Sequence, residues 1–261
     1  MKKATALYEN GQHRWQVLAR DPERPSHLID TNEYLVSNAG LSLLTDPGGQ
    51  EIFPAVFSAL SQATDPRRLT HIFASHQDPD VISSLALWLA LKPDIKCYTS
   101  WLWCTFIPHF GGEPGTFIPV PDEGMNVDFG GKTLTIVPAH FLHSSGNHHL
   151  YDPEAKILFS GDVGAALLPA EHDGLFVGNF DEHVRYAKGF HQRWMGSRDA
   201  RDAWCTRVSR LDIEMMCPQH GAIYRGKDVQ RFISWFAELE VGVLRVGGCA
   251  RGLGCFYEQL F

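Results

Sequence analysis

The chain has 261 residues, with 30 acidic and 23 basic side chains and a net charge of −7. This acidic balance argues against nucleic acid as the main partner, because phosphate binding needs clustered lysine and arginine. Hydrophobic residues make up 44% and aromatic residues 11% of the sequence, so the composition is that of a globular protein rather than a disordered one.

The sequence has no apolar stretch long enough to cross a bilayer, and no apolar signal segment follows Met1. None of the six cysteines forms a C-x-x-C pair. We therefore expect a cytoplasmic protein without membrane contact, whose cysteines stay reduced and act mostly as small buried hydrophobes. A bridge between Cys249 and Cys255 is the less favoured alternative.

The first part of the chain shows short β-rich runs separated by turns, and strands and helices alternate afterwards. We expect strands at residues 5–8, 14–18, 34–37, 41–45, 71–74, 95–99, 133–137, 157–159 and 213–217. Helical periodicity predicts helices at 51–63, 81–91, 199–210 and 228–239. Residues 172–195 are polar and irregular, and we expect a long surface loop there. This order favours a layered α/β fold in a single domain spanning residues 1–261, with helices on both sides of the sheets.

A histidine and two aspartates, His76, Asp78 and Asp80, follow one of the expected buried strands. Each has an explanation without a metal. Asp80 suits the N-cap of the helix expected at 81–91, and Asp78 precedes a proline in a turn. A lone histidine at a strand end is more often a structural residue than a ligand. The triplet alone therefore leaves a structural role and a metal site open.

Three further residues of the same kinds stand at other strand ends. His143, Asp162 and His220 each come at or just after the end of an expected strand. In open α/β sheets, ligands bind where the carboxyl ends of the strands meet. Three imidazoles and three carboxylates that converge there make a purely structural reading unfavourable and predict a metal site.

In their spacing these six residues resemble the metal motif of the metallo-β-lactamase superfamily. Within it, they are most similar to the flavo-diiron branch and its relatives, the stand-alone oxygen-binding diiron proteins. After the triplet that ends at Asp80, the other three follow at the intervals of that motif: His143, Asp162 and His220. The sequences Ser-Gly-Asp162 and Gln-His220-Gly are also typical of the superfamily. The resemblance implies a metallo-β-lactamase-like αββα sandwich.

The resemblance also implies how the ligands divide between two ions. His76, Asp78 and His143 would hold one ion. Asp80 and His220 would hold the other, with Asp162 as the bridge. Three imidazoles and three carboxylates form an oxygen-rich shell that suits iron or manganese better than a zinc pair. Two ferrous ions bring four positive charges, which three carboxylates and one bridging hydroxide would balance, so the buried site would be close to neutral. An oxo group is the alternative bridge.

The sequence departs from the hydrolytic zinc members, which usually carry H-x-H-x-D-H. Here Asp78 replaces the second histidine and Val81 replaces the last one. Flavo-diiron proteins usually have glutamate at the position of Asp78, whereas the oxygen-binding relatives more often have aspartate. Because Val81 offers no donor, the second ion would keep positions open for a neutral diatomic ligand.

Around the ligands, we expect Ser144, Asn147 and Gln219 to orient imidazole rings through hydrogen bonds. We expect Tyr224 at the pocket mouth, where its hydroxyl could donate to a bound oxygen species. The remaining histidines near these loops are interpreted as surface or structural residues: His140, His148, His149 and His172.

Resemblance to flavo-diiron proteins implies reduction of oxygen or nitric oxide, which needs an electron source. The full-length relatives carry a flavodoxin-like domain that binds FMN. The sequence between His220 and Phe261 is too short for such a domain, so we expect no FMN and interpret the glycine-rich segment 246–255 as structural. The favoured function is that of an oxygen sensor or carrier, with dioxygen or nitric oxide as ligand and a signalling protein as partner. A reductase fed by a separate electron-transfer protein is second, and a dinuclear metal hydrolase is third. A homodimer is a further expectation from the resemblance.

Overall fold

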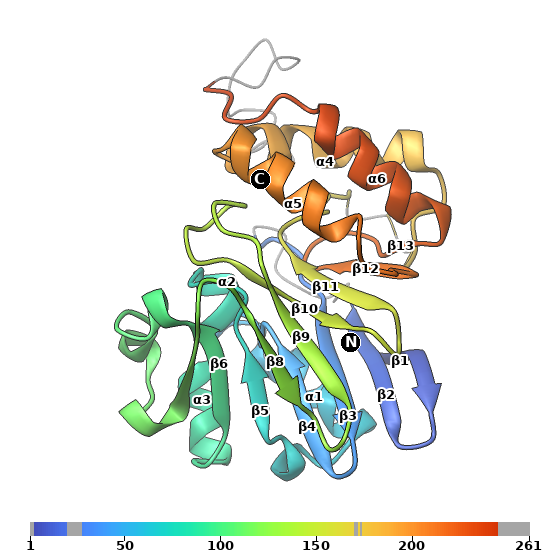
Figure 1. Cartoon of the computed structure of the whole chain (residues 1–261). Coiled ribbons are helices and arrows are strands. Elements are labelled where there is room, and N and C mark those ends of the chain that lie inside the picture. Colours follow the sequence, from blue (N-terminus) through green and yellow to red (C-terminus); the bar gives the residue numbers. More distant parts are fainter. Residues whose placement is uncertain (1–2, 20–27, 170–171, 173, 245–261) are drawn as a thin grey trace.

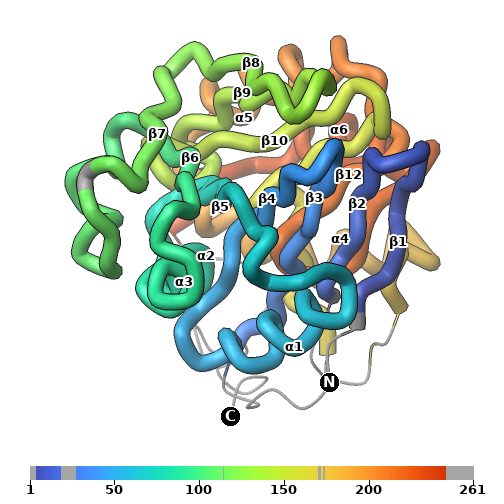
Figure 2. Tube along the Cα trace, turned by 90° about the horizontal axis from the view of Figure 1, so that it is seen from below, coloured from blue at the N-terminus to red at the C-terminus, as the bar shows by residue number. Residues whose placement is uncertain are grey.

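Two β-sheets pack face to face, and helices cover the outer face of each sheet (Figure 1). The computed structural model describes residues 3–19, 28–169, 172 and 174–244. Figure 2 shows α1 on one side of strands β2 to β5, with strands β8 to β10 of the other sheet on the opposite side. The predicted αββα layering is confirmed.

Among the described residues, the first sheet has seven strands, which follow one another in chain order. The first four strands pair antiparallel, and β4 to β7 pair parallel. The strands are β1 (Lys3–Asn10), β2 (His13–Ala19), β3 (Glu33–Asn38), β4 (Leu41–Thr45), β5 (His71–Phe73), β6 (Lys96–Ser100) and β7 (Phe117–Val120).

In the part of the chain that the structure describes, the second sheet has six strands in the order β13-β12-β11-β10-β9-β8. Its pairs are antiparallel except β11 with β12, which is parallel. The strands are β8 (Met125–Asp128), β9 (Thr133–Pro138), β10 (His148–Asp152), β11 (Ile157–Gly161), β12 (Met215–Pro218) and β13 (Tyr224–Arg225).

In the described part of the chain, three helices lie over each sheet. Those on the first sheet are α1 (Phe53–Ala63), α2 (Pro79–Ile82) and α3 (Leu85–Leu91). Those on the second sheet are α4 (Phe180–Trp194), α5 (Arg198–Val208) and α6 (Lys227–Glu238). Short 3-10 helices occupy connections, namely η1 (Pro66–Arg68), η2 (Trp101–Trp103), η3 (Ile107–Phe110) and η4 (Pro114–Thr116).

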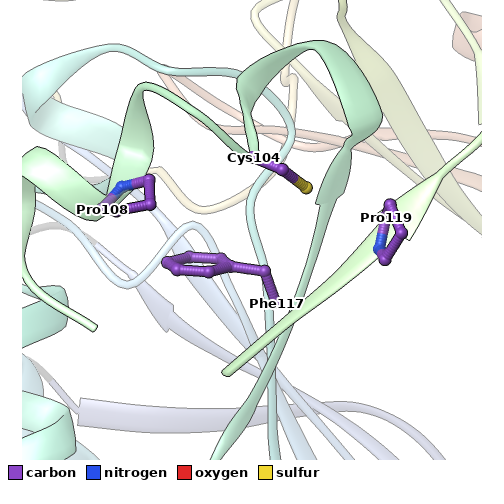
Figure 3. A pocket seen from close by; sticks show the side chains of 4 residues that line it. All are labelled: Cys104, Pro108, Phe117 and Pro119. Atoms are coloured by element: carbon purple, nitrogen blue, oxygen red, sulfur yellow. The ribbon is translucent and has the colours of Figure 1, made fainter. Parts of the chain in front are cut away.

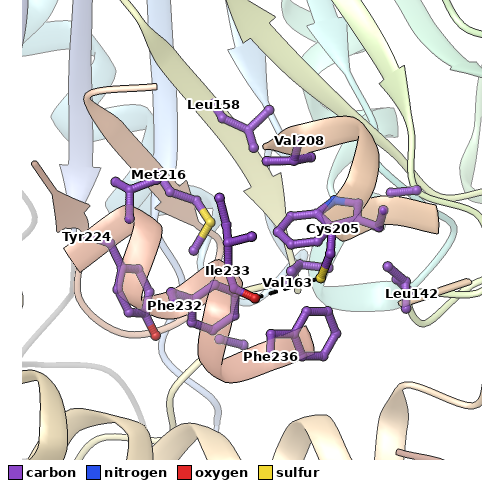
Figure 4. Packing of buried hydrophobic residues seen from close by; sticks show 14 of the residues in the cluster. Leu142, Leu158, Val163, Cys205, Val208, Met216, Tyr224, Phe232, Ile233 and Phe236 are labelled. Atoms are coloured by element: carbon purple, nitrogen blue, oxygen red, sulfur yellow. Dashed lines mark hydrogen bonds between the residues drawn. The ribbon is translucent and has the colours of Figure 1, made fainter. Parts of the chain in front are cut away.

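The apolar side chains form three clusters that correspond to the three interfaces between layers. The cluster beneath α4 to α6 is rich in aromatic rings, among them Phe232 and Phe236 (Figure 4). Both of these rings contact the ring of Trp204. Each fully buried Leu or Phe side chain contributes roughly 1.5–3 kcal/mol to folding. The sandwich therefore has an apolar core at each of the three interfaces between its layers.

A buried polar contact joins the two sheets. The Asp152 carboxylate on β10 lies 2.6 Å from His13 Nε2 and accepts a hydrogen bond of 2.7 Å from Trp15 Nε1, both on β2. Its other oxygen accepts the backbone N–H groups of Glu154 and Ala155. A buried carboxylate needs such partners to offset its lost hydration.

Helix α4 contradicts the predicted loop at 172–195. Its buried face includes His183, Ala187, Phe190 and His191. Histidines at two of these positions obscured the apolar period in the sequence. The Asn179 side chain caps the helix by accepting the backbone N–H groups of the first turn, a preferred N-cap arrangement.

The predicted helix at 81–91 is divided in the structure. It forms α2 and α3, which are separated at Ser83 and Ser84. Asp78, and not Asp80, stands at the N-cap of α2, and its side chain makes no cap hydrogen bond. The predicted N-cap role of Asp80 was therefore wrong.

The other predicted strands and helices are confirmed within a few residues of their predicted ends. Among the described residues, the four cysteines are free, and no helix is long and apolar enough to cross a membrane. The alternative bridge between Cys249 and Cys255, and the glycine-rich segment, lie outside the described residues. The assignment of one domain to residues 1–261 stays a prediction.

Candidate metal centre

All six predicted ligands lie at the carboxyl ends of strands from both sheets. His76 follows β5 of the first sheet, and Asp78 and Asp80 open α2 directly after it. His143 follows β9, Asp162 follows β11 and His220 follows β12, all in the second sheet. The site therefore lies where the carboxyl ends of strands from the two sheets converge.

Two glycines allow the chain to turn sharply beside the ligands. Gly161 has a φ of 50° immediately before Asp162, and a Cβ there would lie 3.2 Å from Ser75 Oγ. Gly221 has a φ of 86° immediately after His220, and a Cβ there would lie 2.7 Å from the Ala166 carbonyl oxygen. Both positions need a residue without a side chain.

The first group of donors consists of His76, Asp78 and His143, and Asp162 faces it. Asp78 Oδ2 lies 3.6 Å from His76 Nε2 and 3.2 Å from His143 Nε2. Asp162 Oδ2 lies 3.5 Å from His76 Nε2 and 3.3 Å from His143 Nδ1. Donor atoms of His76, Asp78 and His143 all lie within 4.8 Å of one another, a separation suited to one cation.

The second group consists of Asp80 and His220. His220 Nε2 lies 3.4 Å from Asp80 Oδ2 and 3.4 Å from Asp162 Oδ1. The two oxygens of Asp162 thus face different groups of donors. This is the arrangement that a bridging carboxylate requires, and it matches the division of ligands that the resemblance implied.

Charges within the site strongly perturb the pKa values of its residues. Burial alone lowers the pKa of His76, but the Asp162 and Asp78 carboxylates outweigh burial and raise this pKa to about 9. Burial likewise opposes protonation of His220, yet Asp162 and Asp80 raise its pKa well above the usual range. Burial would raise the pKa of Asp162, but His76 and His220 hold it well below its usual range. The carboxylates therefore attract positive charge to the centre of the site.

The outer nitrogens of two ligand imidazoles have oxygen partners. His76 Nδ1 lies 2.8 Å from Ser75 Oγ, and the Ser75 hydroxyl donates a 2.6 Å hydrogen bond to Asp46 Oδ2. His220 Nδ1 donates to the Asp30 carbonyl oxygen at 2.7 Å. Both contacts leave Nε2 as the atom that faces the neighbouring carboxylates, which is how metal-binding histidines are usually oriented.

Ser75 and Asp46 are not among the site residues predicted from the sequence. Asp46 directly follows β4, which pairs parallel with β5, and its carboxylate accepts hydrogen bonds from the backbone N–H and the hydroxyl of Ser75. Burial raises the pKa of Asp46 to about 7. The sequence signals were the position of Ser75 directly before His76 and that of Asp46 at the end of a strand.

Removing the Ser75 hydroxyl should lower the affinity with which His76 and its neighbours bind a metal. We expect Ser75→Ala to lower metal affinity roughly 10–100-fold, because the imidazole loses its outer partner. A chelator competition titration with ferrous ion measures this affinity. Ser209→Ala is the matched control, because the Ser209 hydroxyl is exposed and donates only to the Thr206 carbonyl oxygen. Equal affinities in both variants would show that the Ser75 contact does not support the ligand.

The three residues predicted to orient imidazoles make other contacts. The Ser144 hydroxyl donates to Gln77 Oε1, and the Gln77 amide in turn donates to Asp78 Oδ1. The Asn147 amide donates to the Leu142 carbonyl oxygen. The Gln219 amide donates to the Asp80 carbonyl oxygen. The predicted role was therefore wrong for all three, although each contacts the segments that carry the ligands.

The predicted position of Tyr224 at the pocket mouth was also wrong. Tyr224 is fully buried beneath α6, and its hydroxyl donates to the Gly164 carbonyl oxygen at 3.0 Å. Its place in β13 turns the ring toward Phe232, with ring centroids 4.9 Å apart. Val81 is fully buried in the apolar cluster beneath α1 to α3. Its ligand-binding role stays a prediction.

The other histidines of these loops were interpreted as surface or structural residues. His148 lies near the carbonyl oxygens of Gly146 and Pro121. His149 accepts a hydrogen bond from Trp204 Nε1, and burial lowers its pKa to about 3. His140 lies 2.8 Å from the Asp122 carbonyl oxygen. The interpretation is supported for these three.

The donor set fits a pair of transition-metal ions. Nitrogen and oxygen ligands lie about 2.0–2.2 Å from such an ion, so neighbouring donors are about 3–3.6 Å apart. The six distances between neighbouring donor atoms given above fall between 3.2 and 3.6 Å. Asp162 Oδ1 is buried without a hydrogen-bond partner, which also suits a ligand atom. Asp78 and Asp80 remain 30% and 31% exposed, so the site is open to small molecules.

A separate hollow of about 280 Å³ lies near η2 and β7. It is lined by Cys104, Pro108, Phe117 and Pro119 (Figure 3). Burial raises the pKa of the Cys104 thiol, which disfavours the reactive thiolate. This hollow contains none of the six donors and is not part of the candidate metal centre.

The sequence and the fold both match known proteins. The family described as ODP family beta lactamase matches residues 29–221. The structure titled as the peroxy diiron species of the chemotaxis sensor ODP is 37% identical, with a TM-score of 0.81, and the match covers 99% of this chain and 100% of that one. The apo state of the chemotaxis sensor ODP from T. denticola is 36% identical, with a TM-score of 0.84, over 99% of both chains.

A curated relative of a second kind also matches. Diflavin flavoprotein A 1 of Synechocystis is 30% identical over 133 residues, which are 51% of this chain and 23% of the relative. The chain spans about half or less of the length of the curated relatives that it matches. The similarity is thus to one part of those longer proteins.

Proposed function

This chain belongs to the ODP family of beta lactamases, and we propose that it binds dioxygen at a dinuclear iron site as an oxygen sensor or carrier. The membership confirms the predicted resemblance to the metallo-β-lactamase superfamily and its diiron branch. The observation that carries the proposal is the placement of Asp162 between two groups of donors, one oxygen toward each. The similar protein titled as a peroxy diiron species supports the choice of iron and oxygen.

The donor set supports iron over zinc. Three carboxylates and three imidazoles surround the centre, and Asp78 stands where hydrolytic zinc members usually have histidine. Oxygen-rich shells favour iron or manganese. With a bridging hydroxide, two ferrous ions and the three carboxylates would leave the buried site nearly neutral. Ferrous iron supplies the electrons that dioxygen accepts on binding.

The residues of the chain would do three things at this site. His76, Asp78 and His143 would hold one ion, and Asp80 and His220 the other, with Asp162 shared. Ser75 and the Asp30 carbonyl oxygen would fix the orientation of the two imidazoles. Val81 would supply no donor beside Asp80, which leaves a position open on the second ion.

A reductase is the second candidate, and similarity to the longer diflavin flavoprotein favours it. In that case the ligand would be oxygen or nitric oxide, and an electron-transfer protein would be the partner. We propose no FMN for this part of the chain. A signalling partner, a homodimer and a cytoplasmic location stay predictions, as does the hydrolase, the least favoured activity.

Absorbance spectroscopy tests the leading proposal. The iron-loaded protein should contain about two iron atoms per chain, since the donors form two groups. When the anaerobically reduced protein is mixed with oxygen in a stopped-flow instrument, we expect a visible band that forms rapidly and disappears on deoxygenation. Irreversible oxidation without such a band, with sustained oxygen or nitric oxide consumption when a flavodoxin or rubredoxin is supplied, would favour the reductase. Two tight zinc ions and no spectral change on iron loading would count against iron.

Val81→His extends the same test to the open position. The new imidazole would occupy part of that position, so the oxygen-dependent band should weaken or vanish while both ions are retained. Val81→Ala is the matched control, because it disturbs the same buried site without adding a donor. An undiminished band in Val81→His would argue against an open position beside Val81.

A further inference from the structure

A stacked pair of aromatic rings connects the protein surface with one of the proposed ligands. Trp194 is the last residue of α4 and is 37% exposed. Its ring stacks on Phe190, with centroids 5.2 Å apart and an interplanar angle of 11°. Phe190 is buried, and its centroid lies 6.4 Å from that of His220. Two ring contacts therefore separate an exposed indole from the imidazole of His220.

Such a path has a use if the site contains iron. Binding of oxygen by ferrous iron moves electrons to the ligand, and any ferric iron that forms must be reduced again from outside. Electron transfer is fastest through closely packed atoms and slows steeply across gaps. The rings of Trp194 and Phe190 make two successive ring contacts that lead from the surface to His220, whose Nε2 faces the second group of donors.

The segment of the chain around Trp194 is more basic than the chain as a whole. Residues 185–199 contain four exposed basic residues, Arg185, Lys188, Arg193 and Arg198, and one exposed acidic residue, Asp199. The opening of the metal centre instead presents the carboxylates of Asp78 and Asp80. Long-range electrostatics would therefore guide an acidic partner toward α4 rather than toward the opening.

We propose that Trp194 is the entry point for electrons delivered by an acidic one-electron carrier protein of the flavodoxin or rubredoxin class. The carrier docks on the basic surface formed by Lys188, Arg193 and Arg198. One electron then passes through Phe190 and His220 to a ferric ion. The carrier is oxidised by one electron and the ion is reduced from ferric to ferrous, with no bond made or broken. Two such events reduce both ions. This inference rests on the proposed iron site.

Anaerobic stopped-flow reduction tests the path. Oxidised, iron-loaded protein is mixed with reduced flavodoxin, and oxidation of the flavodoxin is followed by its absorbance. We expect Trp194→Leu to slow this step at least tenfold, whereas Trp101→Leu should leave it unchanged, because Trp101 is an exposed tryptophan on η2. Reduction by dithionite, a small reductant that can enter the opening, should be equal in all variants. Equal flavodoxin rates in Trp194→Leu and Trp101→Leu would overturn the path.

Binding to the metal-free protein tests the docking surface without any iron. Titration calorimetry with oxidised flavodoxin should show weaker binding for Arg198→Glu, and the difference should shrink at high salt. Arg68→Glu is the matched control, because Arg68 is exposed on η1 beneath the first sheet. Equal binding by both variants would overturn the docking site.

The two proposals fail in different ways. Normal reduction by flavodoxin, slowed by Trp194→Leu, without any oxygen-dependent band, would reject the sensor and keep the entry point. A reversible oxygen band together with a flavodoxin rate that Trp194→Leu leaves unchanged would reject the entry point and keep the sensor.

Discussion

Asp162→Asn should reduce the metal content from about two ions per chain to one or none, because the bridge between the two groups of donors is lost. Asp162 Oδ2 faces His76 and His143, whereas Oδ1 faces His220. An asparagine replaces one of these oxygens by an NH₂ group, which cannot bind a cation, and it removes the negative charge that holds two cations close. Metal analysis after gel filtration measures the loss.

Asp94→Asn is the matched control for this variant. Asp94 is 75% exposed and pairs with Lys92 at the surface, so its loss should leave the metal content unchanged. Near-ultraviolet circular dichroism of both variants separates loss of metal from loss of fold. If Asp162→Asn kept both ions with unchanged affinity, the bridging role would be rejected.

The metal-free protein should become less stable as the pH rises from about 6.5 to 9. The pKa of folded His76 is about 9, above the usual 6.5. Its contribution is therefore complete below pH 6.5 and is lost as the pH rises through 9, and it amounts to roughly 3 kcal/mol. Asp46 acts in the same direction but mainly at lower pH, because burial raises its pKa to about 7 and its contribution is lost as the pH rises toward and through 7. Urea denaturation at pH 6, 7.5 and 9 measures the effect.

The metal-loaded protein provides the comparison. Bound cations replace the protons of the imidazoles, and a higher pH favours the deprotonated ligands that metals need. The loaded protein should therefore lose less stability between pH 6.5 and 9, or none. His76→Gln should flatten the profile of the metal-free protein, because glutamine does not titrate. A metal-free protein whose stability is constant or rises over this range would contradict the assigned charge interactions.

The six donors could be predicted from the sequence because each follows a strand, and strand ends of this fold converge. Their division into two groups came from the resemblance, and the distances around Asp162 agree with it. The partners behind the ligands could not be found in this way. Ser75 meets Asp46 only because β4 lies beside β5, and the pairing of strands is not written in either segment alone.

The failed predictions have physical causes of the same kind. Tyr224 is four positions from His220, but its two-residue strand turns its ring into the layer beneath the helices. Helix α4 was not predicted because His183 and His191 lie on its buried face, where the helical period is recognised by apolar residues. In both cases the side chain's surroundings depend on contacts that are distant in sequence.

The position of the ligands at converging strand ends of the two sheets has a mechanical consequence. His76 and Asp78 come from the first sheet and His143 from the second, and the same holds for Asp80 and His220. Each ion would therefore be bound by residues from both sheets. The two sheets could then not slide past each other or separate at these strand ends without first releasing the ion. Metal loading would then raise both the stability and the cooperativity of unfolding. Partial separation of the two sheets would cost as much free energy as losing the ion. In the metal-free protein, the contact of Asp152 on β10 with His13 and Trp15 on β2 would still hold the two sheets in register.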